Sequence, residues 1–294
     1  MVWDLLPSWV LSMRAERKAD KTIKSYTEGV DRFLKWCERT GTPPELTATT
    51  VQAFIADLLD HGAEASTALS RQKALRQFAA WLVTEGELDV NPLLGLKPPK
   101  QDKKVTHALT DDQLKALLKA CQGRTLRDRR DEAAVRLMVE TGLRAAETVG
   151  LQMSDVDLTR GLALVHRGKG GKGRFVPFGP QTAAALDRYI RARKAHNLAD
   201  TTALWVGYRS DRPLTYMGLD KTLRQRARDA GIEKFHLHLL RHTAAHRWLR
   251  AGGSEQGLMA VAGWSNRSML DRYTSSSASE RAADEARKLG LGDL

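Results

Sequence analysis

A run of prolines and lysines near residue 100 constrains the fold of this chain more than any other feature. Residues 96–104 read Leu-Lys-Pro-Pro-Lys-Gln-Asp-Lys-Lys. The paired prolines exclude a helix and the lysines resist burial, so this run belongs to no domain core. Because 294 residues also exceed one typical domain, we expect two domains: a helical domain over 1–98 and a second over 106–294, joined by a linker at 99–105.

The first part of the chain carries apolar residues at helical spacing. The clearest case begins after Asp20, a candidate helix cap, and stops at Gly41. Its apolar positions are Tyr26, Val30, Phe33, Leu34 and Cys37. The same pattern recurs over 5–13, 51–59 and 69–82. We therefore expect four helices before the linker.

The second part begins with another helical signature and then changes. Thr110 and Gln113 fit a capping box ahead of a helical pattern. Further along, Leu162 to Val165 and Phe175 to Phe178 are short apolar, β-branched runs that flank the glycine-rich stretch Gly168 to Gly173. Such an arrangement predicts a hairpin. The expected fold is mainly α-helical with a small antiparallel β-sheet.

Composition favours a polyanionic partner. The chain has 47 Lys and Arg against 35 Asp and Glu, a formal charge of +12, which is the electrostatic footprint of a protein that neutralises phosphates. Ribosomal, membrane-surface and heparin-binding proteins share this property, so motifs must decide. Cys37 and Cys121 lie far apart in helical patterns and predict a reducing compartment. Without a basic leader or an apolar run of ~20 residues, we expect no membrane contact and a cytoplasmic location.

Five segments of the second part carry side chains suited to phosphodiester chemistry. Cutting this bond by direct attack needs a nucleophile, donors for charge on the non-bridging oxygens, and an acid for the leaving oxygen. Arginine suits the donor role because its planar fork holds two phosphate oxygens and stays charged. The segments are Thr141 to Glu147, Gly168 to Arg174, His238 to His242, Gly263-Trp264 and Tyr273.

In this order the segments resemble the signature of the tyrosine recombinases, or phage integrases: Arg, Lys, His-x-x-Arg, His or Trp, and Tyr. Residues 22–36 and 66–100 resemble the family's core-binding domain, so the resemblance covers nearly the whole chain. The pattern is most similar to the small Xer-like integrases, which lack an arm-binding domain. The resemblance implies a two-domain clamp that closes around duplex DNA.

The resemblance also implies a role for each catalytic residue. Arg144 and Arg241 grip the scissile phosphate, and Lys169 acts as the general acid toward the leaving oxygen. His238 handles the proton of the nucleophile Tyr273, whose attack leaves a 3′-phosphotyrosine. Because tyrosine ionises near pKa ~10, attack at neutral pH needs a base and a cationic environment, which these residues supply.

Other residues are expected to support this site. Trp264 stands where many relatives have histidine, and its indole N–H donates one hydrogen bond but carries no proton. Glu147 follows Arg144 by one helical turn and is expected to orient it, while His242 is expected to be buried and hydrogen-bonded. Lys172 is the alternative acid. The residues expected to contact DNA are Lys97, Lys100, Lys103, Lys104, Lys172 and Arg174.

The resemblance implies partners as well. Strand exchange takes place in a homotetramer bound to two duplex DNA sites, whereas the protein without DNA is expected to be a monomer. A directionality factor is a candidate accessory protein, and the site of action is the nucleoid. Ser277 to Leu289 has a helical capping signature and a thin apolar stripe, which predicts docking into a neighbouring protomer. No metal or nucleotide cofactor is expected.

Three alternatives compete with this interpretation. His238, His242 and His246 have the four-residue spacing of metal ligands on one helix face, although Arg241 and Arg247 crowd the same segment and repel a dication. A type IB topoisomerase-like enzyme forms the same phosphotyrosine but relaxes DNA without synapsis. A DNA-binding regulator requires a degenerate site, whereas this signature is intact.

Overall fold

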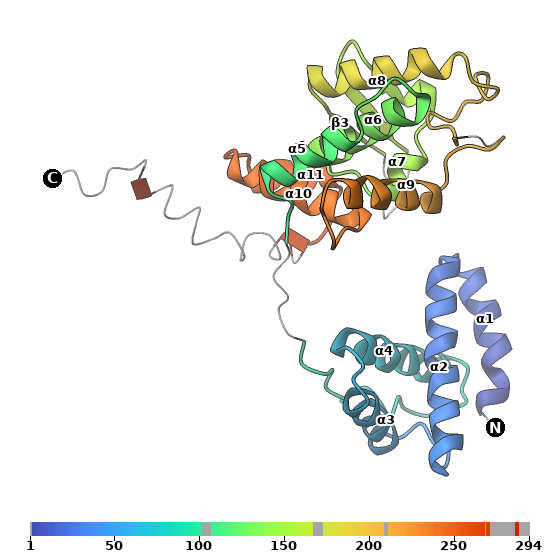
Figure 1. The fold of residues 1–294 in the computed structure, drawn as a ribbon. Helices are drawn as coiled ribbons and strands as arrows, with labels where there is room; N and C mark the ends of the chain where they lie inside the picture. Colours follow the sequence, from blue (N-terminus) through green and yellow to red (C-terminus); the bar gives the residue numbers. More distant parts are fainter. Residues whose placement is uncertain are drawn as a thin grey trace. The chain divides into compact units, whose positions relative to one another are not determined.

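The computed structural model describes residues 2–101, 107–166, 173–208, 211–267, 269–270 and 286–287. The chain divides into two compact units, Met1–Lys104 and Val105–Leu294 (Figure 1). Most of the described residues are helical, and the named strands form a small antiparallel sheet in the second unit. The expected fold class is confirmed. No helix in the described ranges is both long and apolar enough to cross a membrane.

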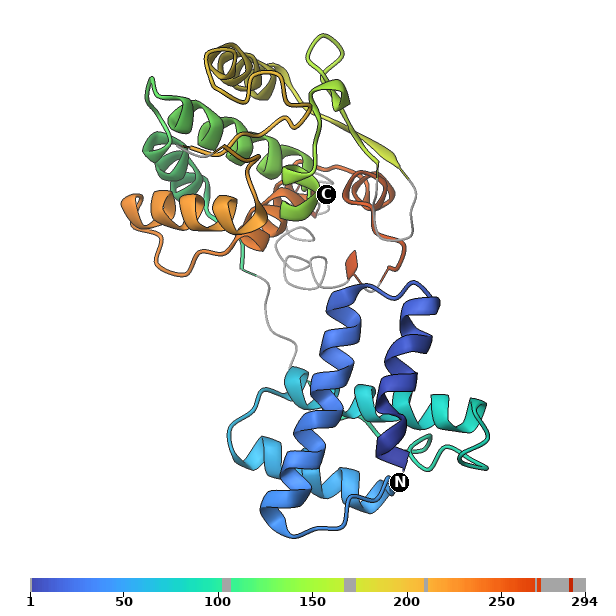
Figure 2. The ribbon, with the colours of Figure 1, turned by 90° about the vertical axis from the view of Figure 1, so that its right-hand side faces the viewer.

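The first unit is helical throughout, as the apolar spacing predicts. It contains η1 (Val2–Leu5), α1 (Leu6–Ala15), α2 (Asp20–Thr40), α3 (Ala48–Asp60) and α4 (Ala65–Thr84). Helices α1 and α2 lie side by side (Figures 1 and 2). Aromatic rings fill the centre: the Phe33 and Phe54 centroids lie 5.4 Å apart and those of Trp9 and Phe78 lie 5.0 Å apart. Such pairs add stability beyond their buried area.

Asp20 has a different position from the one expected. The cap residue of α2 is Ala19, and Asp20 is the first residue of the helix itself. Its carboxylate therefore lies in the first turn, where its negative charge interacts favourably with the positive end of the helix dipole.

The stretch after α4 is held onto that helix, because Gln72 Nε2 donates to the carbonyls of Leu96 and Lys97 over 3.3 and 3.1 Å. The side chains of Lys97 and Lys100 are exposed.

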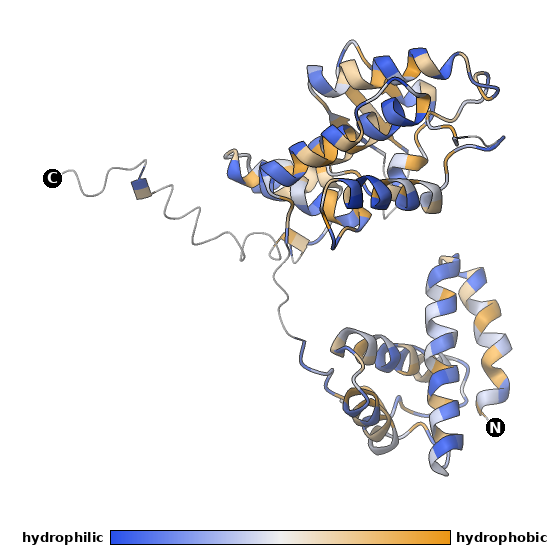
Figure 3. Ribbon diagram, in the orientation of Figure 1, coloured by the Kyte–Doolittle hydropathy of each residue, from blue (hydrophilic) through white to orange (hydrophobic). Residues whose placement is uncertain are grey.

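The second unit surrounds helix α6 (Leu126–Thr141), which packs against α8 (Pro180–Arg193) and α10 (Leu237–Arg250). Hydrophobic residues form stripes along the helices of both units (Figure 3). The remaining helices are α5 (Asp111–Ala120), α7 (Ala145–Val149), η2 (Met153–Asp155), α9 (Tyr216–Asp229) and α11 (Glu255–Ala262). The capping box at Thr110 and Gln113 is confirmed, with both reciprocal hydrogen bonds present.

The expected hairpin is present, and a third strand extends it. Strands β2 (Leu162–Val165) and β3 (Arg174–Pro177) pair antiparallel, with Val165 opposite Arg174. On the other side of β2 lies β1 (Val156–Asp157), which gives the order β1-β2-β3. A strand of two residues has no periodicity, so the sequence pattern does not predict β1.

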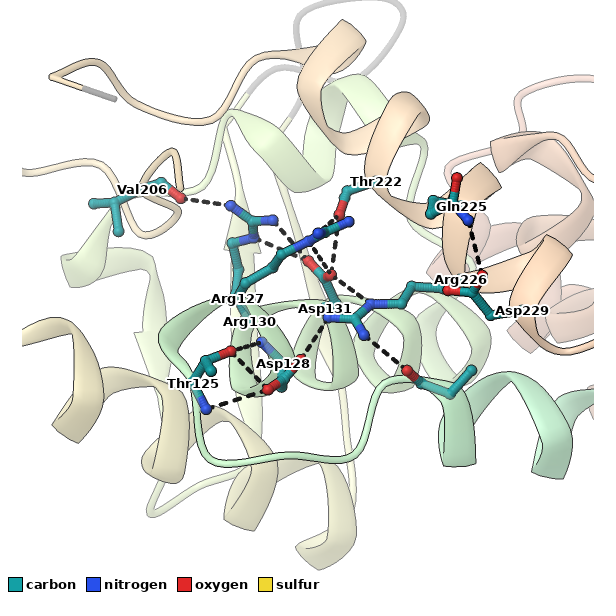
Figure 4. A network of polar contacts seen from close by, with 11 residues as sticks. Thr125, Arg127, Asp128, Arg130, Asp131, Val206, Thr222, Gln225, Arg226 and Asp229 are labelled. Carbon is teal, nitrogen blue, oxygen red and sulfur yellow. Dashed lines mark hydrogen bonds and ion pairs between the residues drawn. The ribbon is translucent and has the colours of Figure 1, made fainter. Parts of the chain in front are cut away.

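A buried cluster of charges joins three helices of the second unit (Figure 4). Asp131 of α6 is 0% exposed and accepts hydrogen bonds from Arg130 over 2.8 Å and from Arg226 of α9 over 3.0 Å. Arg226 also donates to the carbonyl of Ala120 at the end of α5 over 2.9 Å. A buried carboxylate needs such partners, because burying an unpaired charge costs far more than burying a paired one.

We expect Asp131→Asn to destabilise the second unit by about 3–5 kcal/mol, since it leaves the buried Arg130 guanidinium without its anion. Denaturant unfolding followed by circular dichroism measures this change. The matched control is Asp187→Asn, which breaks an exposed pair with Arg191 and costs at most about 1 kcal/mol. Equal losses for the two variants would contradict the assignment of Asp131 as the centre of the network.

Candidate active site

Seven of the side chains expected at the site lie in the described part of the second unit, on elements labelled in Figure 1. They come from α7 and the residue before it, the start of β3, the first turns of α10 and the residues just after α11. They are Arg144, Glu147, Arg174, His238, Arg241, His242 and Trp264. Lys103, Lys104, Lys169, Lys172 and Tyr273 lie outside the described residues.

Arg144 is placed by the end of one helix and the start of the next. Helix α6 stops at Gly142, whose φ of 66° is readily adopted only by glycine, and Arg144 has an extended backbone ahead of α7. The carboxylate of Glu147 accepts from the Arg144 backbone N–H over 2.8 Å and from Nη1 over 2.9 Å. The contact expected from their spacing is therefore present. The Arg144 side chain remains 28% exposed.

Glu147 has a second and stronger partner. Arg174 of β3 donates from Nη1 to Oε1 over 3.0 Å and from Nη2 to Oε2 over 2.8 Å, a two-pronged ion pair. Burial raises the pKa of Glu147, but the hydrogen bonds and charges of Arg174 and Arg144 outweigh burial and hold this pKa below its ordinary value. Glu147 is thus a charged group, only 6% exposed, between two cations.

Arg174, which is expected to contact DNA, is held by protein acceptors in the structure. Its side chain is 12% exposed, and Nε donates to the carbonyl of Val261 in α11 over 2.8 Å. All three guanidinium nitrogens therefore donate to protein acceptors. The reason is its place as the first residue of β3, where the strand directs the side chain toward α7 and α11.

Arg241 is held by the ends of two helices. Its side chain is 2% exposed. Nη1 donates to the carbonyl of Gly142, just after α6, over 2.7 Å, and Nη2 donates to that of Ala262, the last residue of α11, over 2.8 Å. These carbonyls lie at helix C-termini, where backbone acceptors lack helical partners and carry partial negative charge. No sequence pattern predicts these two hydrogen bonds, because backbone acceptors have no residue signature.

Trp264 packs within the protein. Helix α11 is capped at its end by Gly263, whose φ is 64°. The backbone N–H of Trp264 then donates to the carbonyl of Met259 over 2.9 Å. The buried indole packs in a cluster with Leu249 and Leu258, and the Arg241 guanidinium lies 5.2 Å from its centroid. A hydrogen bond from Trp264 to a phosphate stays a prediction.

Two histidines of α10 meet edge to face beside Arg241. The rings of the exposed His238 and the partly buried His242 lie 4.5 Å apart at 83°. Burial, followed by the positive charges of His238, His236, His246 and Arg241, lowers the pKa of His242 to about 3. His242 is therefore neutral at physiological pH. In the described ranges, no three His, Cys, Asp or Glu side chains are arranged to hold a metal ion.

We expect the depressed pKa of His242 to make the protein less stable in acid. Unfolded histidine has a pKa near ~6.5, so between this pH and about 3 only the unfolded state takes up the proton. The stabilisation is complete above the unfolded pKa and is lost as pH falls, by at most about 1.4 kcal/mol per pH unit. Urea unfolding of wild type and His242→Asn at pH 7 and pH 5 isolates this contribution. Equal losses in both proteins would contradict it.

Two family models match the chain and together span most of it. Residues 107–280 match the phage integrase family, and residues 5–86 match the N-terminal SAM-like domain of phage integrase. The first match alone covers more than half of the chain, and it includes the seven described side chains of the candidate site as well as Lys169, Lys172 and Tyr273.

Individual proteins agree with these models. Tyrosine recombinase XerC of Chromobacterium violaceum is 34% identical over 258 residues, which cover 87% of this chain and 85% of the relative. The crystal structure of XerA recombinase is 28% identical with a TM-score of 0.56, covering 97% of this chain and 99% of that one. The lambda integrase tetramer bound to a Holliday junction is 17% identical with a TM-score of 0.68, covering 90% and 77%, and shares the fold. The chain therefore belongs to the phage integrase family, the tyrosine recombinases.

Proposed function

We propose that this protein is a site-specific DNA recombinase that cuts and rejoins duplex DNA through a 3′-phosphotyrosine intermediate. The observation that carries the proposal is the placement of Arg144 and Arg241 at the same turn after α6. Arg144 follows Gly142 by two positions, and Arg241 donates to the carbonyl of Gly142. Two guanidiniums anchored at one turn suit a single phosphate group, because each fork matches two oxygens.

The proposed reaction balances without an external energy source. The Tyr273 oxygen attacks the scissile phosphorus, a P–O bond to Tyr273 forms, and the P–O5′ bond breaks. His238 takes the proton of the tyrosine, and Lys169 gives a proton to the leaving 5′ oxygen. A 5′ hydroxyl of the other duplex then attacks the phosphorus, so that a new P–O5′ bond forms and the bond to Tyr273 breaks. The two proton transfers are reversed: Lys169 takes the proton of the hydroxyl, and His238 returns a proton to Tyr273. One phosphate ester replaces another at each step, so neither ATP hydrolysis nor a metal ion is part of the scheme.

The rest of the site supports the charge change in this reaction. Negative charge grows on the non-bridging oxygens as the five-coordinate phosphorus forms, and fixed cations lower that barrier because they need no rearrangement. His238 is exposed at the first turn of α10, one turn before Arg241 on the same helix. A side chain there reaches the solvent side, from which DNA approaches.

We further propose the assembly in which this reaction occurs. The lambda integrase, a neighbour by fold, has been solved as a tetramer on a Holliday junction. Four copies of this chain on two duplex sites, with Ser277 to Leu289 docked between protomers, give one nucleophile for each strand. We propose that the protein is a monomer in the absence of DNA. A directionality factor is the proposed accessory partner, and nucleoid DNA is the proposed substrate. No observation favours a topoisomerase-like activity or a regulatory role.

Covalent trapping tests the proposal. Wild type incubated with nicked duplex DNA that carries candidate sites is expected to give an adduct on a denaturing gel, because the nick releases the leaving strand and blocks religation. Tyr273→Phe is expected to give none, while Tyr216→Phe, at an exposed tyrosine of α9, serves as the matched control and retains the adduct. Arg144→Ala is expected to slow adduct formation by about 10²–10³-fold.

Either of two results contradicts the mechanism. One is the absence of any wild-type adduct on a DNA site that the protein is shown to recombine or bind specifically. The other is an adduct that persists in Tyr273→Phe, which requires another nucleophile.

A further inference from the structure

We infer that Arg174 is a positioning residue for the cleavage reaction: it holds Glu147 and the end of α11 together and thereby sets Arg144 relative to Arg241. The inference rests on the proposed function, because it takes both Arg144 and Arg241 to contact the scissile phosphate. Arg174 itself does not touch DNA in this scheme.

The first step is the way in which two arginines share one carboxylate. Arg174 contacts both oxygens of Glu147 in parallel, over 3.0 and 2.8 Å. Arg144 contacts Oε1 through Nη1 alone, besides its backbone N–H to Oε2. Arg174 is the more enclosed of the two, 12% exposed against 28%. Glu147 therefore forms its tighter side-chain pair with Arg174, the more buried arginine. The guanidinium of Arg144 is oriented by a single hydrogen bond to Glu147.

The second step follows the contacts onward from Arg174. Its Nε donates to the carbonyl of Val261 over 2.8 Å, and the next carbonyl, that of Ala262, accepts from Arg241 over 2.8 Å. Arg241 then donates to the carbonyl of Gly142 over 2.7 Å, which returns the path to the turn before Arg144. The circuit joins α7, β3, α11 and α10, and Arg174 is the member that connects the sheet to the helices.

The third step is electrostatic. With Arg174 in place, two cations share the single negative charge of Glu147. The positive charge of Arg144 is then only partly balanced by Glu147 and can attract an anionic ligand. Without Arg174, the 6% exposed carboxylate of Glu147 has Arg144 as its remaining cation in this group. Because Coulomb attraction is stronger in a poorly hydrated site, the guanidinium is then drawn toward Glu147 and away from the phosphate. The expected loss is in the rate of cleavage.

The surroundings leave Arg174 little freedom to adopt another position. A Cβ at Gly263 would lie 2.9 Å from Cζ of Arg174, so the glycine at the end of α11 makes space for the guanidinium.

A double-mutant cycle tests the inference. Wild type, Arg174→Gln, Glu147→Gln and the double variant are compared in single-turnover cleavage of nicked duplex DNA at saturating protein, and in DNA affinity across a salt series. We expect Arg174→Gln to slow cleavage by about 10–100-fold, since displacing a catalytic group by ~1 Å has effects of this size. Its affinity is expected to stay within about twofold of wild type. The double variant is expected to cleave no slower than Arg174→Gln, because both residues act through the same contact.

Arg191→Gln is the matched control, because this α8 arginine forms an exposed pair with Asp187 and is expected to cleave as wild type does. Thermal unfolding checks each variant. If Arg174→Gln does not unfold cooperatively, Arg174→Lys replaces it, since lysine keeps the charge but cannot form the two-pronged contact. A slower rate at unchanged affinity is again expected.

Three results overturn the inference. A fall in DNA affinity with a salt slope reduced by about one identifies Arg174 as a phosphate contact. Rate losses that multiply in the double variant show that Arg174 and Glu147 act independently, and a wild-type rate in the Arg174 variant shows that it positions nothing. Failure of the proposed function is distinguishable, because then wild type itself forms no adduct or Arg144→Ala cleaves at the wild-type rate.

Discussion

The ionised carboxylate of Glu147, enclosed between Arg144 and Arg174, is the interaction on which the site depends. A carboxylate that is 6% exposed remains charged only if cations and N–H donors replace its lost water. Meeting that need links β3 to α7, because Arg174 stands on the strand and Glu147 on the helix. The third donor of Arg174 then places the last turn of α11 on the same group.

The second unit uses the same chemistry in two places with different consequences. At Asp131, the carboxylate is fully buried and its partners Arg130 and Arg226 are enclosed by α5, α6 and α9, so the charges are matched inside the fold. At Glu147, one of the two cations, Arg144, remains 28% exposed. The first cluster therefore joins helices, whereas the second presents an oriented cation at the surface. Its exposure, and not its residue type, separates Arg144 from the enclosed arginines of the Asp131 cluster.

The sequence predicted what local patterns encode. Helical spacing gave the helices of the first unit, and Thr110 with Gln113 gave a helix start, because each depends on residues close in the chain. The contact of Glu147 with Arg144 was predictable for the same reason. The pair of Arg174 with Glu147 spans 27 positions, and its bond to Val261 ends on a backbone carbonyl, so neither leaves a local signature. The sequence pattern accordingly placed Arg174 among the DNA contacts and did not predict its pair with Glu147.

Backbone acceptors also explain how the site can keep an excess of positive charge. Arg241 donates to the carbonyls of Gly142 and Ala262, and Arg174 donates Nε to Val261, all three at or beside helix C-termini. Such carbonyls orient a guanidinium through partial charges and do not cancel its full charge as a carboxylate does. Two guanidiniums, those of Arg144 and Arg174, share the carboxylate of Glu147, whereas that of Arg241 is held by the two carbonyls. A phosphodiester gains negative charge as it passes to the five-coordinate transition state, so cations held in this way favour that state over the bound substrate.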